Sequence, residues 1–427
     1  MDGLSVKDVP VVVTRSMFLG ALKGGFESAE SSNTESVRVL EADSDVSVTL
    51  ALAQIDYVTG QMLAEPGHDD VMLAPRDRIT SLFLSYLAER MAKSATPVRP
   101  VGAGGYEADL DGHDLAWATK ALIPWIRQRL KQGRCEWKDA PAPVEALPNK
   151  CRMAVLGDWG TGMYGAPLSA QSIERDGDFQ VLLHLGDVYY TGTADEILTR
   201  FLAYWPKIRT ATTRCLNGNH EMYSGGTPYF GMLPHFDQHG SYFAMQNDHW
   251  LFVGLDTSYT EYELEGAQVA WLAELVARAG ERKIVLLSHH QPFSIDGKPT
   301  LRLISQLAPF LDRQQIFAWY WGHEHWCAIF DRHKRWNMYG RCVGHGGMPE
   351  FRSKSLGQIP TSPTFVRQPG RGSAPGYLFL DGPNTHVKGH ASEYTPHGYL
   401  VLELDGPQLT EEYYEAAGFL LERRTLA

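Results

Sequence analysis

The sequence predicts an α/β protein, and three observations lead to that prediction. From residue 150 onward, short apolar runs with β-branched residues recur, each about the length of a buried strand. The segment 265–283 between two of these runs places apolar residues at helical spacing. Most runs end in Asp, Asn or His, as expected where the loops at the strand ends of an α/β sheet form a site. We therefore expect residues 148–427 to form a catalytic-type α/β domain.

Residues 1–147 are predicted to form a smaller, mainly helical accessory domain. Apolar residues recur at helical spacing over 77–93, and Asp77 is placed to cap that helix. A second helical pattern covers 113–133, where Pro124 is expected to kink or interrupt the helix. This region could serve as a protein-binding or regulatory module whose output is the larger domain.

Three further segments are described by composition or pattern. Residues 37–58 alternate enough to suggest short strands. The Pro-rich stretch 139–150 is predicted to be a linker between the two domains. Residues 352–376 are rich in Pro, Gly and Ser, and we expect a long excursion on the surface.

Six apolar runs in the larger domain are predicted as strands. They cover 152–158, 179–187, 213–221, 250–256, 283–290 and 316–325. Each run is short enough for a strand and too short for a typical helix. Continuous apolar character predicts strands that are buried on both faces of a sheet.

Composition limits the classes of function. The 427-residue chain carries a net charge of −11, so we expect no broad basic surface for nucleic acid. Its five cysteines are odd in number and lack a C-x-x-C pair, which argues against a disulfide framework and favours a reducing compartment. We see neither a signal-peptide pattern nor an apolar run long enough to span a membrane, and we predict a cytoplasmic protein without membrane contact.

Five of the predicted strand ends finish in residues that bind metals. The motifs are GDWG, GDVYY, GNHE, SHHQP and GHEH, and they contain Asp158, Asp187, Tyr190, Asn219, His220, His289, His290, His323 and His325. Carboxylate, amide oxygen and imidazole together suit iron, manganese or zinc, and the absence of thiolate argues against a structural zinc site. Each motif alone is weak, because a Gly-Asp pair is usually a turn and a loop histidine is usually solvated. All five in one order indicate a metal centre.

Residues 150–345 resemble the calcineurin-like metallophosphoesterase superfamily. The usual first motif there is D-x-H, whereas this chain has Asp158-Trp159-Gly160, and its second motif carries Tyr190 in G-D-x-x-Y. Both departures resemble the purple acid phosphatase branch, in which a tyrosinate binds a ferric ion. The resemblance implies a two-sheet αββα sandwich around a binuclear metal centre.

The resemblance also implies a role for each site residue. The first metal would be bound by Asp158, Tyr190 and His325, the second by Asn219, His323 and either His289 or His290, with Asp187 as the bridge. We favour His289 because it is the first side chain past its strand, which leaves His290 to contact substrate or orient the loop. His220, one residue past a ligand, is the candidate proton donor. Glu221 would orient His220 or a ligand, with a surface salt bridge as the alternative.

These residues lead to a functional hypothesis. We expect a binuclear metal-dependent hydrolase of small phosphate esters, most simply a phosphomonoesterase, with a metal-bound hydroxide as nucleophile and His220 as general acid. Two metal ions are expected, iron with iron, manganese or zinc. One alternative is a phosphodiesterase that acts on cyclic nucleotides or lipid-linked diesters. A second is a non-catalytic metal-binding regulatory protein, although the presence of both Asp187 and His220 argues against it.

Overall fold

The computed structural model describes residues 12–14, 17–18, 68, 71–72, 75–93, 98–100, 106–108, 133–139, 143–353 and 356–427. The predicted strands within 37–58 lie outside these residues. So does the predicted helix over 113–133, except for its last residue.

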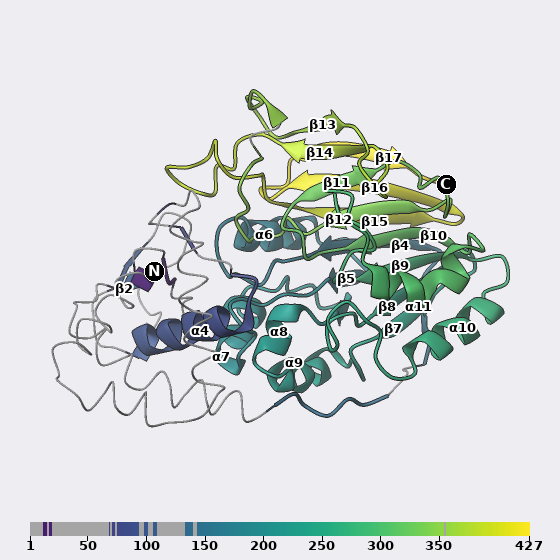
Figure 1. The fold of residues 1–427 in the computed structure, drawn as a ribbon, viewed down its shortest axis with the longest axis horizontal. Coiled ribbons are helices and arrows are strands. Elements are labelled where there is room, and N and C mark those ends of the chain that lie inside the picture. Colours follow the sequence, from purple (N-terminus) through teal and green to yellow (C-terminus); the bar gives the residue numbers. More distant parts are fainter. Residues whose placement is uncertain are drawn as a thin grey trace.

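Two sheets form the centre of the molecule (Figure 1). One has six strands in the order β17 (Leu420–Thr425), β16 (Gln408–Glu415), β15 (Gly398–Asp405), β4 (Lys150–Leu156), β5 (Val181–His184) and β6 (Thr212–Cys215). The other has nine in the order β13 (Thr364–Gln368), β14 (Tyr377–Asp381), β11 (Cys327–Phe330), β12 (Tyr339–Val343), β10 (Ile316–Trp321), β9 (Lys283–Ser288), β8 (Trp250–Leu255), β7 (Phe243–Gln246) and β3 (Glu145–Ala146). All six predicted runs contain a strand.

The strands that precede the candidate motifs run parallel within each sheet. In the six-stranded sheet β4 pairs with β5, and β5 pairs with β6, in parallel. In the nine-stranded sheet β8, β9 and β10 are parallel neighbours. The carboxyl ends of parallel neighbours meet at one edge of a sheet, so each sheet brings its motifs together.

The inner faces of the two sheets share one apolar core. Val155 and Leu183 from the six-stranded sheet belong to the same buried cluster as Phe252, Val285 and Ala318 from the nine-stranded sheet. Side chains of alternate positions point to opposite faces of a strand, so each sheet has a second apolar face that also requires cover.

Helices cover those outer faces. On the nine-stranded sheet they are α10 (Gln268–Arg278) and α11 (Leu301–Leu311). On the six-stranded sheet they are α6 (Ala166–Asp176) and the π-helical turn η2 (Ile197–Leu202), which directly follows a short α7 (Ala194–Glu196). The predicted helix over 265–283 is α10, which is shorter because Gly280 turns the chain with φ of 62°. The fold is the predicted two-sheet αββα sandwich.

Three short helical elements connect β6 to β7. They are α8 (Asn219–Tyr223), α9 (Thr227–Met232) and the 3₁₀ turn η3 (Leu233–Phe236). Asn219 and His220 of the GNHE motif are the first two residues of α8, immediately after Gly218. The motif residues therefore sit in a helical turn that follows the strand.

The N-terminal helix α4 (Arg78–Lys93) confirms the prediction over 77–93. Asp77 caps it, since the Asp77 carboxylate accepts a hydrogen bond from the Thr80 amide at 2.8 Å. Phe83 and Leu87 lie in one buried cluster with Tyr189 and Tyr190, so α4 packs against the loop that follows β5. A short antiparallel pair, β1 (Val98–Pro100) and β2 (Tyr106–Ala108), completes the described N-terminal part.

Two of the segments predicted from composition contain strands instead. Within 139–150, β3 pairs in parallel with β7, and the Glu145 carboxylate accepts hydrogen bonds from Arg214 at 2.8 Å. The linker prediction is wrong for these residues because sheet hydrogen bonds and a charge pair hold them. Within 352–376, β13 extends the edge of the nine-stranded sheet.

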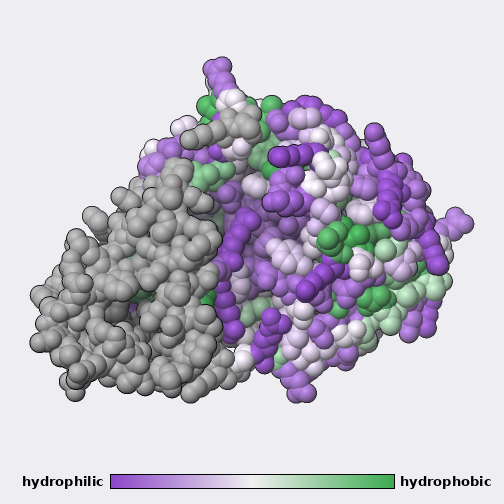
Figure 2. Space-filling model, in the orientation of Figure 1, coloured by the Kyte–Doolittle hydropathy of each residue, from purple (hydrophilic) through white to green (hydrophobic). Residues whose placement is uncertain are grey.

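The visible described surface is mainly hydrophilic, with apolar residues in small separate patches (Figure 2). Leu301 and Phe419 are the most exposed large apolar side chains among the described residues. No helix in the described part of the chain has the length and apolarity needed to cross a bilayer. All five cysteines are described, and each is unpaired.

Candidate metal centre

The ends of five parallel strands deliver the candidate ligands. Asp158 follows β4 and Asp187 follows β5, while His323 follows β10 of the other sheet. All three have positive φ, at 53°, 76° and 67°, a conformation that is uncommon for residues other than glycine. Such backbone strain occurs most often at functional sites, where the surrounding structure holds it in place.

A first group of atoms surrounds Asn219. Its Oδ1 lies 2.9 Å from His289 Nε2 and 3.0 Å from His323 Nδ1. His289 Nε2 also lies 3.2 Å from His323 Nδ1 and 3.4 Å from Asp187 Oδ1. All four side chains are buried.

The hydrogen bonds around this group leave acceptors facing one another. His289 Nδ1 lies 2.9 Å from the Leu185 carbonyl oxygen, which only accepts, so Nδ1 carries the proton and Nε2 presents a lone pair. The amide nitrogen of Asn219 donates to the Tyr223 hydroxyl at 2.9 Å, which leaves Oδ1 in the group. Ligands about 2.1 Å from one metal ion and at right angles to each other lie about 3 Å apart. The residues present therefore fit a bound cation.

A second group surrounds the Tyr189 hydroxyl. This oxygen lies 3.0 Å from Asp158 Oδ1, 3.2 Å from Asp187 Oδ2 and 3.0 Å from His325 Nε2. His325 Nε2 lies 3.5 Å from Asp158 Oδ1. Asp187 thus places Oδ2 in this group and Oδ1 in the first, as required of a residue that bridges two metal ions.

Tyr190 does not lie in either group, so the structure does not bring it to the other candidate ligands as the sequence predicted. Its hydroxyl accepts a hydrogen bond from the Val13 amide at 3.0 Å and lies 3.3 Å from the Val13 carbonyl oxygen. The Arg200 guanidinium lies 4.8 Å from the centre of its ring. After β5 the chain turns so that Tyr189 points toward the carboxylates and Tyr190 points toward the N-terminal segment.

His220 lies at the site as predicted. Its Nδ1 is 2.6 Å from the Tyr190 carbonyl oxygen, and its Nε2 is 3.8 Å from Asp187 Oδ2. Because a carbonyl oxygen only accepts, Nδ1 is the donor in the first contact, and Nε2 faces the site. The backbone amide of His220 also donates to Asp187 Oδ1 at 3.1 Å, so the turn of α8 holds that carboxylate.

Glu221 contacts the backbone of the candidate ligand Asp187. Its Oε2 accepts a hydrogen bond from the Asp187 backbone amide at 3.2 Å, and its side chain is buried. A surface salt bridge is therefore ruled out for this residue. Glu221 orients the loop of Asp187, and the structure shows no hydrogen bond from its carboxylate to the His220 ring among the described residues.

His290 remains an alternative to His289 as a ligand. His290 Nδ1 donates to the Thr257 carbonyl oxygen at 2.9 Å, and Nε2 has no hydrogen-bond partner among the described residues. One nitrogen from each of His289, His290 and His323 lies within 4.8 Å of the others. The distances to Asn219 and Asp187 favour His289.

Burial and mutual repulsion perturb the two carboxylates. Burial, together with the negative charge of Asp187, raises the pKa of Asp158 well above its usual range. Burial acts to raise the pKa of Asp187 as well, but His289 and His220 lower it below its usual range. One buried carboxylate therefore resists ionisation beside the other, and a cation between them would relieve that repulsion.

Two glycines make room for these carboxylates. A Cβ atom on Gly218 of GNHE would lie 2.1 Å from Asp187 Oδ1, and one on Gly322 of GHEH would lie 2.7 Å from Asp158 Oδ2. Any side chain at either position would displace a carboxylate. The glycines of these motifs are therefore required by close approach to the site.

Sequence reasoning missed four residues at or near the centre. The sequence pattern points to Tyr190, whereas the structure brings the hydroxyl of Tyr189 to the centre. The Tyr262 hydroxyl lies 2.9 Å from His323 Nε2, Glu350 Oε2 lies 3.3 Å from His325 Nδ1, and Arg76 Nη2 lies 3.4 Å from that same Glu350 oxygen. A Tyr-Tyr pair was the only signal for Tyr189, and no motif marks the other three.

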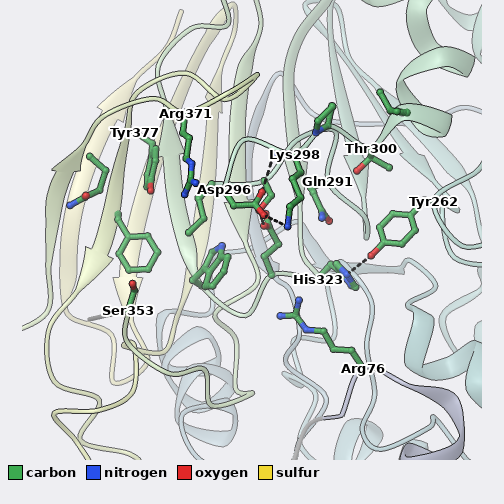
Figure 3. A pocket seen from close by; sticks show the side chains of 18 of the residues that line it. Arg76, Tyr262, Gln291, Asp296, Lys298, Thr300, His323, Ser353, Arg371 and Tyr377 are labelled. Atoms are coloured by element: carbon green, nitrogen blue, oxygen red, sulfur yellow. Dashed lines mark hydrogen bonds and ion pairs between the residues drawn. The ribbon is translucent and has the colours of Figure 1, made fainter. Parts of the chain in front are cut away.

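A cavity of about 820 Å³ adjoins the centre (Figure 3). His323 forms part of its wall, with Arg76 and Tyr262 beside it, and the cavity extends to Arg371 and Tyr377. Pockets that bind small molecules typically measure about 300–1,000 Å³. The cavity is thus large enough for the organic part of a small substrate.

The sequence of the core matches one known protein family. The family model for calcineurin-like phosphoesterases matches residues 151–327. No curated protein sequence matches the chain.

Solved structures that match this chain include a purple acid phosphatase from seeds of yellow lupin (Lupinus luteus), which is 16% identical, with a TM-score of 0.47 over 67% of this chain and 54% of that one. GAP50, the anchor in the inner membrane complex of Plasmodium, is 14% identical, with a TM-score of 0.45 over 64% of this chain and 88% of its own. A dimetal phosphatase from Danio rerio is 12% identical, with a TM-score of 0.40 over 65% of this chain and 98% of its own. This chain therefore spans about half the length of the lupin phosphatase. Over residues 151–327, the core of this chain is similar to the calcineurin-like phosphoesterase family.

Proposed function

We propose that this protein is a binuclear metal-dependent hydrolase of small phosphate esters and that it acts on phosphomonoesters. One observation carries the proposal: Asp187 contributes one carboxylate oxygen to each of two neighbouring groups of ligand atoms. The match of residues 151–327 to the calcineurin-like phosphoesterase family supports the same chemistry.

The residues divide into two sets that share Asp187. Asp158, Tyr189 and His325 would hold one ion, and Asn219, His289 and His323 would hold the other. We propose iron with iron, manganese or zinc, because oxygen and imidazole ligands without thiolate suit these metals. Such a pair, when bound, polarises the phosphoryl oxygens and lowers the pKa of water to about 7.

Partners outside the two groups set the orientation of the histidines. Leu185 accepts from His289, Tyr262 lies beside His323 and Glu350 beside His325. Contacts of this kind fix the ring orientation of metal-binding histidines and typically affect metal affinity by about 10–100-fold. The chain thus holds its ligands in place before any substrate arrives.

His220 is placed to supply a proton to the leaving oxygen. Its Nδ1 proton is held by the Tyr190 carbonyl oxygen at 2.6 Å, so a second proton on the charged ring lies on Nε2 and faces the site. Nε2 is 3.8 Å from Asp187 Oδ2, near the shared carboxylate. General acid catalysis of this kind typically contributes about 10²–10⁴-fold.

Two other functions remain as alternatives to be tested. A phosphodiesterase would use the same groups, and the shape of the cavity would decide between the two ester classes. A regulatory protein would bind the metals without turnover. We place the protein in the cytoplasm by the same proposal and expect the N-terminal region to contact a protein or regulatory partner.

Hydrolysis of p-nitrophenyl phosphate and bis-p-nitrophenyl phosphate, side by side, tests the proposal. We expect the metal-loaded protein to prefer the monoester, metal removal to abolish turnover, and His220→Ala to lower it by about 10²–10⁴-fold with metal content retained. His239→Ala, at an exposed position, is the matched control. A preference for the diester would overturn the monoester assignment. Metal binding without turnover of either ester would favour the regulatory alternative.

A further inference from the structure

The cavity beside the metal centre has two distinct ends. Arg76 and His323 lie at the end next to the metal centre, whereas Arg371 and Tyr377 lie at the other, as Figure 3 shows. A substrate whose phosphate reached the metal centre would therefore extend its organic group toward β14.

Arg76 is suited to bind the phosphate. It comes from the segment that precedes α4, outside residues 151–327, and its only carboxylate contact among the described residues is the one at 3.4 Å to Glu350. Its side chain is 48% exposed, so most of its five N–H donors remain available to a ligand in the cavity. A guanidinium presents paired donors that match two oxygens of a phosphate group.

Five aromatic side chains line the cavity along its length. They are Tyr262, Trp326, Phe351, Tyr377 and Phe379. The rings of Trp326 and Phe379 pack edge to face, with centres 6.1 Å apart and planes at 60°. An aromatic lining of this kind favours edge-on or stacked contact with the ring of an aromatic ligand. Two buried polar atoms in the lining, Trp326 Nε1 and Gln291 Oε1, have no hydrogen-bond partner among the described residues, so a donor and an acceptor are available there.

The lining carries an excess of positive charge in a chain whose net charge is −11. Four basic residues, Arg76, Lys298, Arg302 and Arg371, line it against two acidic ones, Asp296 and Glu324.

The four cations differ in how they are paired. Lys298 forms an ion pair with Asp296 at 2.8 Å, and Arg302 forms one with Glu263. Arg371, unlike the other three, is in none of the ion pairs found among the described residues. An unpaired guanidinium at the end far from the metal centre offers a site for a second anionic group.

We propose that this cavity binds a phosphomonoester whose organic group is aromatic and carries a second negative charge. Arg76 binds the phosphate to be hydrolysed, the aromatic lining receives the ring, and Arg371 binds the second anionic group. This inference rests on the proposed hydrolase function and specifies its substrate class.

The test uses benzyl phosphates, whose leaving alcohols have similar reactivity. The probes are benzyl phosphate, 4-carboxybenzyl phosphate and its carboxamide, together with the pair extended by one ring, 4′-carboxybiphenyl-4-ylmethyl phosphate and its carboxamide. The measured quantity is kcat/KM for each carboxylate divided by kcat/KM for the carboxamide of the same length. We expect this ratio to be about fivefold to tenfold at one of the two lengths, the size of one typical net hydrogen bond, and to fall with added salt.

Two variants assign the roles. Arg371→Gln is expected to bring the carboxylate-to-carboxamide ratio to about one, whereas Arg278→Gln, on the exposed face of α10, leaves the ratio unchanged. Arg76→Gln is expected to weaken binding of inorganic phosphate to the metal-loaded protein, measured by calorimetry, by about tenfold, with Arg76→Lys in between. Binding does not depend on turnover, so it reports on Arg76 independently of catalysis.

The outcomes separate the two proposals. If none of the benzyl phosphates is hydrolysed by the metal-loaded protein, the hydrolase function is wrong. If benzyl phosphate is hydrolysed but the carboxylates show no advantage at either length, the inference about the substrate class is overturned and the hydrolase stands. If the advantage persists in Arg371→Gln, the second anionic group binds elsewhere, and the role of Arg371 is wrong.

Discussion

The choice between Tyr189 and Tyr190 is the sharpest consequence of the structure. The sequence spacing assigns Tyr190 to the metal, whereas the structure places the Tyr189 hydroxyl within 3.0–3.2 Å of Asp158, Asp187 and His325. Tyr189→Phe and Tyr190→Phe each remove one buried hydroxyl from neighbouring residues. The two variants are therefore matched in size and differ only in what the hydroxyl touches.

The expected magnitudes differ in kind. Removing the Tyr189 hydroxyl takes away an atom that contacts three candidate ligands, so we expect metal affinity to fall by about 10–100-fold. The Tyr190 hydroxyl instead exchanges hydrogen bonds with the Val13 backbone, at 3.0 and 3.3 Å. Its removal should cost about 1–3 kcal/mol of unfolding free energy, because buried backbone groups lose their partner. Metal affinity should then change little.

The assay combines metal content after dialysis against graded chelator with the visible spectrum of the iron-loaded protein. We expect Tyr189→Phe to lose metal at lower chelator concentration and to lose any tyrosinate-to-iron absorption band. We expect Tyr190→Phe to keep both and to unfold at a lower denaturant concentration. Loss of the band and of metal in Tyr190→Phe, with neither lost in Tyr189→Phe, would refute the assignment from the structure.

Three further outcomes follow from the structure. Gly218→Ala should lower metal affinity by at least about tenfold, because the new Cβ would lie 2.1 Å from Asp187 Oδ1. Chelator competition measures this affinity, and an unchanged value would contradict the prediction. Glu411→Gln should cost about 3–5 kcal/mol in urea unfolding, since it leaves buried Arg341, now 2.7 Å from Glu411, without its charge partner, and a cost below about 1 kcal/mol would contradict it. Burial lowers the pKa of His345 to about 3. Between pH 6.5 and 3 this histidine is therefore protonated in the unfolded chain and neutral in the folded protein, so the unfolding free energy decreases as the pH is lowered through that window. His345 should account for a loss of about 2 kcal/mol of unfolding free energy between pH 6.5 and 5. The slope of unfolding free energy against pH should therefore be shallower in His345→Gln than in the wild type, and an equal slope in the two proteins would contradict this.

The parts of the fold that could be predicted from the sequence are those marked by local pattern. The apolar runs that became β4, β8 and β9 are continuous because both faces of those strands are covered. Their ends fall at Asp or His, so the location of the site followed from the way parallel strands meet at one edge. The segment around β3 was harder, because only two residues pair and its prolines suggest a linker.

The parts of the site that could not be predicted depend on the path of the chain. Tyr189 and Tyr190 are adjacent, and which one faces the carboxylates is decided by contacts made after folding, such as the Glu196 carboxylate that accepts from the Tyr190 amide at 2.7 Å. Arg76 and Glu350 meet near the centre although they are 274 residues apart in the sequence. No spacing rule connects such positions.

Metal stoichiometry tests the central claim most directly. The account holds that two groups of ligands share Asp187, so native mass spectrometry of the metal-loaded wild-type protein should find two ions per chain. Asp187→Asn should weaken both ions together, because each group loses part of the shared carboxylate. A folded wild-type protein that binds a single ion or none at saturating metal would contradict the binuclear centre and the hydrolase built on it.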